Sequence, residues 1–241
     1  MTPEEQRAAL FEQLVNEGIL DESDRILWEL LTPERALKMD AVLRQRTRHI
    51  AVLLEAVDDG HNQAAVLRSC EAFGVQNIGI VAGRGGWQPS QGVTQGADKW
   101  LSLHHYATIE EAIRAMQRRG YRVLASRLDE HATPIQEIDL RQPVALLFGN
   151  EHDGVSDEAV ALADGTFIIP MYGFVQSLNI SVAAAVSIFH TTQRARREVG
   201  DAYFLTPEER RAILRRWMTS NTPQARRVAA ALRRTASSDQ S

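Results

Sequence analysis

The sequence has little of what disulfide, zinc and lysine-dependent sites require. Cys70 is the only cysteine among 241 residues, which excludes an intrachain disulfide and a cysteine-based zinc site. Lysine occurs only at Lys38 and Lys99, so a lysine phosphate grip or a Schiff base has little basis. No apolar run is long enough to span a bilayer, and the acidic, amphipathic N-terminus is unlike a secretory signal. We therefore expect a cytoplasmic protein without a membrane partner.

Familiar nucleotide, metal and hydrolase motifs are also missing. The segment GRGGW at 83–87 does not complete the dinucleotide fingerprint, and no Walker-type G-K-[ST] occurs. His104 and His105 are neighbours on a predicted strand and point to opposite faces, which does not suit a metal site. Ser177 lies in VQSLN, which is not the G-x-S-x-G elbow of a serine hydrolase. We expect no metal and no dinucleotide.

Charge is distributed unevenly along the chain. The net charge is −4, from 27 basic and 31 acidic residues. Residues 190–241, however, hold 11 arginines against 5 acidic residues, a net charge of +6. A basic end on an otherwise acidic chain indicates a segment that faces nucleic acid, and the alternative is a solvated basic helix.

Apolar runs of strand length alternate with amphipathic helices through the middle of the chain. The first is HIAVLLEAV at 49–57, followed by a polar turn and the helical QAAVLRSCEAF. Further strand candidates have the same apolar character: 75–83, 100–106, 121–127, 143–149 and 166–170. This alternation predicts βαβ units and a mostly parallel sheet that is buried on both faces. We predict an α/β domain at 48–195 between a helical extension at 1–47 and a basic helical extension at 196–241.

Three turns that follow predicted strands are unusually polar. They are DDGHNQAAVLRS at 58–69, LLFGNEHDGVS at 146–156 and IIPMYGFVQSLNIS at 168–181. Open parallel sheets bind ligands beyond the carboxyl ends of their strands, so we expect these turns to surround the site. The last turn leads into an apolar helix through Gln176, Ser177, Asn179 and Ser181, which is more polar groups than one helix cap needs.

Together the three turns resemble the signature motifs of the SpoU-type RNA ribose 2′-O-methyltransferases of the SPOUT superfamily. The matching motifs are N-x5-R at Asn62 and Arg68, G-N-E-x-x-G from Gly149, and IPMYGFVQSLNISVA. The outer segments ALKMDAVLRQRTRHIAVLLEAV and YFLTPEERRAILRRWM resemble the helical extensions of the tRNA guanosine-18 methyltransferase branch, the TrmH type. One position departs from that branch, because Gly60 stands where proline is common.

The resemblance implies a C-terminal deep trefoil knot in the α/β domain, a known exception to the rule against knotted chains. It implies S-adenosylmethionine as the methyl donor, bound bent in the knot and without a metal. It also implies a homodimer whose active site uses both knotted domains, and no obligate protein partner is evident. The residues that would line the donor pocket are Ser126, Gly149, Ile169, Met171 and Leu178.

The resemblance also assigns catalytic positions, which are Arg68, Asn62, Glu151, Ser177 and Asn179. Arg68 would grip the target phosphate and align the ribose 2′-oxygen, or act as the base, although an arginine is normally protonated. Each residue has a structural alternative. Arg68 could form a surface ion pair with Glu71. Asn62, and one of Ser177 and Asn179, could cap a helix. Glu151 could lie in the first turn of a helix, where the helix dipole stabilises a negative charge.

The implied function is methyl transfer to a ribose 2′-hydroxyl of RNA, and the two helical extensions favour guanosine 18 in the tRNA D-loop. The alternatives are another tRNA or rRNA nucleotide, or a knotted RNA-binding protein without turnover. The predicted tRNA-binding residues lie on TPEERRAILRRWM and are Arg210, Arg211, Arg215 and Arg216. In the competing account, Ile213, Leu214 and Trp217 dock this helix on the α/β domain and the arginines merely solvate it.

Overall fold

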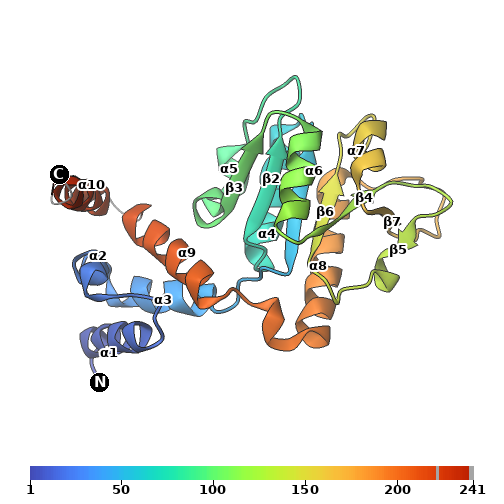
Figure 1. The fold of residues 1–241 in the computed structure, drawn as a ribbon. Coiled ribbons are helices and arrows are strands. Elements are labelled where there is room, and N and C mark those ends of the chain that lie inside the picture. The colour runs from blue at the N-terminus through green and yellow to red at the C-terminus, as the bar shows by residue number, and fades with distance from the viewer. Residues whose placement is uncertain (221–222, 239–241) are drawn as a thin grey trace. The chain divides into compact units, whose positions relative to one another are not determined.

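The computed structural model describes residues 1–220 and 223–238, and the chain divides into two compact units (Figure 1). The sheet unit comprises Arg46–Phe204, and the helical unit comprises Met1–Gln45 together with Leu205–Ser241. The segments before and after the α/β region therefore belong to one unit. Residues 221–222 and 239–241, which fall in the predicted basic extension, lie outside the described residues.

The sheet unit contains a seven-stranded sheet in which every paired strand is parallel to its neighbour. The strand order is β3-β2-β1-β6-β4-β7-β5. The strands are β1 (Ile50–Glu55), β2 (Asn77–Val81), β3 (Ser102–Tyr106), β4 (Arg122–Ser126), β5 (Thr133–Pro134), β6 (Val144–Phe148) and β7 (Gly165–Ile168). The predicted parallel α/β architecture is confirmed, and only the two-residue β5 was not predicted, because it is too short to show a pattern.

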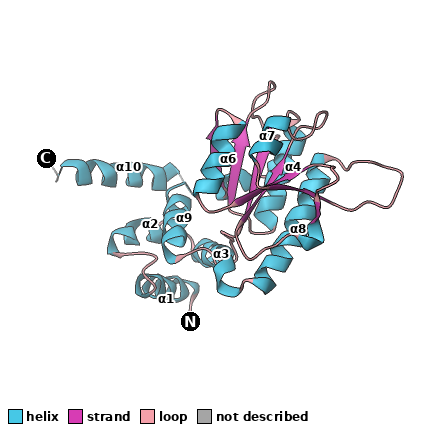
Figure 2. Ribbon diagram, turned by 45° about the vertical axis from the view of Figure 1, so that its right-hand side comes forward, coloured by secondary structure: helices cyan, strands magenta, loops and turns pink. Residues whose placement is uncertain are grey.

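Helices cover both faces of the sheet (Figures 1 and 2). They are α4 (Gly60–Ala72), α5 (Gln91–Thr94), α6 (Ile109–Arg118), α7 (Asp157–Leu162) and α8 (Ile180–Glu198), with short 3-10 turns at Ala97–Trp100, Ile135–Glu137 and Gly200–Tyr203. Alternate residues of β1 serve the two faces, as expected for a strand. Val52 belongs to one core cluster with residues of α4 and α8, whereas Leu53 belongs to the other with residues of α6 and α7. All six residues of β1 are buried, which explains why the first five, at 50–54, are apolar.

The helical unit contains helices from both ends of the chain. They are α1 (Pro3–Asn16), α2 (Arg25–Glu29), α3 (Pro33–Leu43), α9 (Pro207–Ser220) and α10 (Pro223–Ser238), with a 3-10 turn at Glu22–Asp24. Thr2 and Thr32 cap α1 and α3, each followed by proline at the first helical position. Thr206 caps α9, because its hydroxyl accepts from the backbone N–H of Glu209. None of the helices in the described part of the chain has the length and apolar character needed to cross a membrane.

Candidate active site

The three polar turns lie at the same edge of the sheet, because the strands are parallel and their carboxyl ends face one way. The turn at 56–59 follows β1, and the turn at 149–156 follows the neighbouring β6. Ser126 ends β4, and Ile169 follows β7, which pairs with β4. Segments that lie far apart in the sequence thus form one surface, at the place where the sequence predicts a ligand site.

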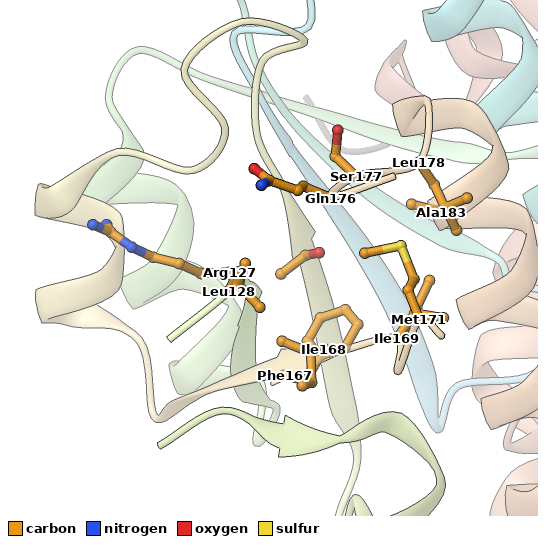
Figure 3. Close-up of a pocket in the computed structure, with 11 residues that line it drawn as sticks. Arg127, Leu128, Phe167, Ile168, Ile169, Met171, Gln176, Ser177, Leu178 and Ala183 are labelled. Carbon is orange, nitrogen blue, oxygen red and sulfur yellow. The ribbon is translucent and has the colours of Figure 1, made fainter. Parts of the chain in front are cut away.

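A pocket of about 170 Å³ lies between the ends of β4 and β7 and the start of α8 (Figure 3). Apolar side chains form much of its wall, among them Phe167, Ile169 and Met171. Figure 3 shows Gln176 and Ser177 on one side of the pocket and Phe167 on the other. An apolar slot with amide and hydroxyl groups along one side suits a flat heteroaromatic ring with polar edges.

A second pocket, of about 420 Å³, continues from the first and shares four lining residues with it: Ser126, Ser177, Leu178 and Ala183. It adds Gly149, the turn at 150–154 and Asn179. We call the two together the paired pocket. All five residues predicted for the donor line it, and so do three of the five predicted catalytic residues: Glu151, Ser177 and Asn179.

Gly149 leaves no room for a side chain. A Cβ there would lie 2.1 Å from the backbone carbon and oxygen of Gly154. The turn is closed by two backbone hydrogen bonds of 3.0 Å between Asn150 and Gly154, and Gly154 has a φ of +69°. The backbone of this turn therefore packs directly on Gly149, and the cradle beside the paired pocket depends on glycine at that position.

Asn62 and Glu151 meet across 89 residues of sequence. The Asn62 side-chain amide donates to Glu151 Oε1 at 2.9 Å, and the Asp58 backbone N–H donates to Oε2 at 3.4 Å. Neither residue has the structural role that was its alternative. The residue that caps α4 is Asp59 and not Asn62. The pKa of the Asp59 carboxyl is lowered chiefly by the hydrogen bond that it accepts from the His61 backbone N–H. Glu151 lies in the turn after β6, ahead of α7, and not in the first turn of a helix.

Arg68 lies on α4 with an exposed side chain, outside the paired pocket. Glu71, with which Arg68 could have formed a surface ion pair, instead accepts a hydrogen bond from the guanidinium of Arg46 at 2.9 Å. The Arg46 side chain is 1% exposed and the Glu71 side chain 32% exposed, so the pair joins a buried guanidinium to a carboxylate near the surface. Within one copy of the chain, the structure does not bring Arg68 together with the other predicted catalytic residues.

The polar entry to α8 divides into two roles. Asn179 caps the helix, because its side-chain oxygen accepts from the backbone N–H of Ser181 at 2.8 Å and from the Ser181 hydroxyl at 2.6 Å. It also lines the paired pocket, so capping and lining are combined in one residue. Ser177 and Gln176 precede the cap and lie on the pocket wall. One cap therefore accounts for two of the four polar groups, and the pocket accounts for the others.

Three of the four arginines predicted to bind tRNA form ion pairs within the helical unit. Arg210 lies 3.4 Å from Glu17 and 3.6 Å from Asp40. Arg211 pairs with Asp21, and Arg215 pairs with Asp21 at 2.8 Å and with Asp24 at 2.7 Å.

The fourth, Arg216, is exposed. Ile213, Leu214 and Trp217 are buried, and α9 packs against α2 and α3 within the helical unit. The competing account expected the arginines of this helix to be merely solvated. That expectation is wrong for Arg210, Arg211 and Arg215, which form ion pairs.

Sequence reasoning missed Phe167, Arg127 and Ala183, which also line the paired pocket. Phe167 lies in the predicted strand TFIIP, whose alternation could have indicated it. No comparable signal marks the other two. Among the described residues, no group of three His, Cys, Asp or Glu side chains is placed to hold a metal ion.

Comparison with known families and proteins relates this site to a known chemistry. Residues 49–189, which make up more than half of the chain, match the model of the SpoU rRNA Methylase family. The tRNA (guanosine(18)-2′-O)-methyltransferase of Thermus thermophilus is 43% identical over 189 residues, which are 78% of this chain and 97% of that protein.

Two solved structures extend the comparison. The Aquifex aeolicus TrmH/SpoU tRNA modifying enzyme superposes with a TM-score of 0.71 at 32% identity, over 78% of this chain and 97% of its own. The AdoMet-bound rRNA methyltransferase of Sinorhizobium meliloti has a TM-score of 0.54 at 27% identity, over 67% of this chain and 60% of its own.

Proposed function

The chain belongs to the SpoU rRNA methylase family, and we propose that it methylates the ribose 2′-hydroxyl of guanosine 18 in tRNA, with S-adenosylmethionine as the donor. The observation that carries this function is the match to tRNA guanosine-18 methyltransferases over almost the full length of those proteins, and the motif residues that meet at the carboxyl ends of the strands support it. A cytoplasmic location follows from the proposed substrate.

The paired pocket fits the donor. Adenine is flat and apolar on its faces, which suits Phe167, Ile169, Met171 and Leu178, while amide and hydroxyl groups nearby suit its edge. Because residue 149 is glycine, the pocket wall at this position is formed by backbone atoms and not by a side chain. When bound there, the donor supplies an electrophilic methyl group, and we propose that a trefoil knot in the region of β7 and α8 holds it bent.

The remaining residues position the ribose. Glu151 holds Asn62 by a hydrogen bond of 2.9 Å and therefore fixes the amide beside the pocket. Ser177 and Asn179 place a hydroxyl and an amide at the pocket wall. We propose that Arg68 binds the phosphate of the target nucleotide by a charge-assisted contact and so aligns the 2′-oxygen with the methyl group.

Because Arg68 lies outside the paired pocket of its own chain, we propose that it acts in the pocket of a second copy. A homodimer would place the exposed side of α4 and the entry of α8 from different copies at one site. Helices α4 and α8 pack on each other in the sheet unit, which makes one continuous face available for such pairing.

The function is tested by incubating the full-length protein with unmodified tRNA transcripts and a donor labelled in its methyl group. We expect one labelled methyl per tRNA, mapped to the 2′-oxygen of guanosine 18. Calorimetry should show S-adenosylhomocysteine binding without RNA at a Kd of about 1 μM, or roughly −8 kcal/mol.

Label at another ribose would replace the assigned nucleotide while keeping the chemistry. Donor binding without any methylation of tRNA or rRNA would favour a knotted RNA-binding protein. The absence of binding heat at high protein concentration would contradict the methyltransferase function itself.

We further propose that α9 contributes affinity for tRNA, with phosphates competing for the arginines that Asp21, Asp24 and Glu17 hold in the free protein. Changing Arg210, Arg211, Arg215 and Arg216 to glutamine should therefore flatten the dependence of log affinity on log salt by roughly 0.7 to 0.9 for each phosphate that the variant no longer neutralises. Filter binding of tRNA between low and physiological salt measures this slope.

The same variant should also melt at a lower temperature, because it leaves the partner carboxylates unpaired. S-adenosylhomocysteine affinity serves as the control and should stay at the wild-type value. A lower melting temperature with an unchanged salt slope would assign these arginines to the stability of the helical unit alone.

A further inference from the structure

A third pocket, of about 720 Å³, lies at the carboxyl ends of β1 and β2. We call it the β1–β2 pocket. It shares the turn residues Asn150, His152, Asp153 and Gly154 with the paired pocket, so one thin turn separates the two. Its other lining residues come from the ends of the two strands and the start of α7: Glu55, Ala56, Asp58, Ala82, Gly83, Arg84 and Ser156.

Two carboxylates of this pocket are held in different ways. Glu55 is buried, and both of its oxygens accept from Ser156, at 2.9 Å from the backbone N–H and 2.6 Å from the hydroxyl. Asp58 is exposed, and only its Oδ1 accepts a hydrogen bond within the described part of the chain, from the Gly85 backbone at 3.3 Å. One carboxylate is thus occupied by the fold, while the other is oriented and retains an oxygen for a ligand.

The loop after β2 is shaped around Asp58. A Cβ at Gly83 would lie 2.2 Å from Asp58 Oδ1, so glycine lets the loop approach the carboxylate closely. On its other side, the Asp58 backbone N–H donates to Glu151, the residue that also holds Asn62. Asp58 is therefore in direct contact with Glu151, which together with Asn62 is proposed to position the ribose.

The chemistry of the lining selects among ligands. A phosphate would be repelled by three carboxylates of the lining: Asp58, Glu55 and Asp153. Among the described residues, no group of three His, Cys, Asp or Glu side chains could hold a metal ion. Each oxygen of a carboxylate can accept two hydrogen bonds, so Asp58 offers Oδ2 and the second acceptor position of Oδ1, and it suits a group that presents two donors side by side. The Watson–Crick edge of guanine has this pattern, with N1–H beside the exocyclic amine, whereas adenine presents an acceptor at N1. Arg84 and His152 add planar groups on which a base can stack.

We propose that the β1–β2 pocket receives the base of the target nucleotide and that Asp58 selects guanine by accepting from N1–H and the 2-amino group. This inference rests on the proposed function, since it requires a guanosine whose ribose lies at Asn62 and Glu151. Asp58 is a specificity residue in this scheme and takes no part in the methyl transfer.

The test measures single-turnover methylation of tRNA transcripts that carry guanosine, inosine or adenosine at the target position, for the full-length wild type and for Asp58→Asn. The wild type should prefer guanosine over inosine, which lacks the 2-amino group, by about 10- to 100-fold. The asparagine side chain keeps the size of aspartate but presents one donor and one acceptor. The variant should lose most of that preference and gain relative rate on adenosine, because asparagine pairs with adenine's donor and acceptor.

Comparing ratios between enzymes on the same transcripts cancels any effect of the base on tRNA folding. Asp201→Asn, an exposed aspartate outside all three pockets, is the matched control and should keep the wild-type ratios. A slower Asp58→Asn enzyme with wild-type ratios would overturn the inference and leave the proposed function intact. If the wild type methylates a nucleotide other than guanosine, the function assigned to the chain fails and the base-reading role fails with it.

Discussion

Arg68→Ala should lower the single-turnover rate of tRNA methylation by about a thousandfold or more, which corresponds to roughly 4 kcal/mol of lost transition-state stabilisation. The large effect is expected because Arg68 would align the nucleophilic oxygen, and misalignment of reacting groups is costly. S-adenosylhomocysteine affinity should change less than about twofold by calorimetry, since Arg68 lies outside the paired pocket. A rapid-quench assay with saturating enzyme measures the rate.

Two variants help to interpret this result. Arg68→Lys keeps the charge but loses the planar fork, so an intermediate rate is expected if Arg68 grips a phosphate. Arg118→Ala removes another exposed arginine of the sheet unit, from α6 on the other face of the sheet, and should leave the rate at the wild-type level. A near-wild-type rate for Arg68→Ala would contradict the proposed role.

The sheet could be predicted from the sequence because its central strands, β1 and β6, are buried on both faces. β6 and the first five residues of β1, at 50–54, are apolar and buried at every position, and uninterrupted apolar runs bounded by turns are readable without a structure. β5 has two residues and makes no pattern of its own. It exists because β7 provides a neighbouring strand, which is a tertiary effect.

The site could be predicted only as far as local chemistry reaches. The residues that the family resemblance assigned to the donor all line the paired pocket, since the motifs follow strands of one parallel sheet. The contact between Asn62 and Glu151 and the approach of Gly83 to Asp58 depend on how loops from different strands meet. The sequence also indicated polar groups before α8 without showing which of them is the cap, because Ser and Asn both suit that role.

Charge along the sequence was the least reliable guide. The arginines near the C-terminus were interpreted as facing RNA because their own segment holds few acidic residues. In the folded chain, Asp21 pairs with both Arg211 and Arg215, which lie 190 and 194 positions away. Pairing over such separations leaves no trace in local composition. A surplus of one charge in a segment therefore does not show that the charge is available to a partner.

Val186→Asp should prevent formation of the proposed homodimer and should abolish methylation while preserving the fold. On α8, Val182, Val186 and Phe189 are 47%, 41% and 52% exposed and share one side of the helix, at i, i+4 and i+7. The loop before the helix adds Phe174, which is fully exposed. An apolar stripe of this kind indicates a surface that another protein covers, and a symmetric pair of copies is the commonest arrangement.

An unpaired carboxylate buried in that interface should cost about 3 kcal/mol or more in each copy, which weakens association by at least about 10⁴-fold. Light scattering at micromolar concentration should then give the 26.9 kDa mass of one chain rather than twice that value. The melting temperature of the sheet unit should be retained, since Val186 is exposed within one copy. Ile26→Asp, which places the same charge on an exposed apolar residue of the helical unit, should leave the dimer mass unchanged. A monomeric wild type, or a monomeric variant that methylates tRNA at the wild-type rate, would contradict an active site built from two copies and would require Arg68 to reach the ribose within its own chain.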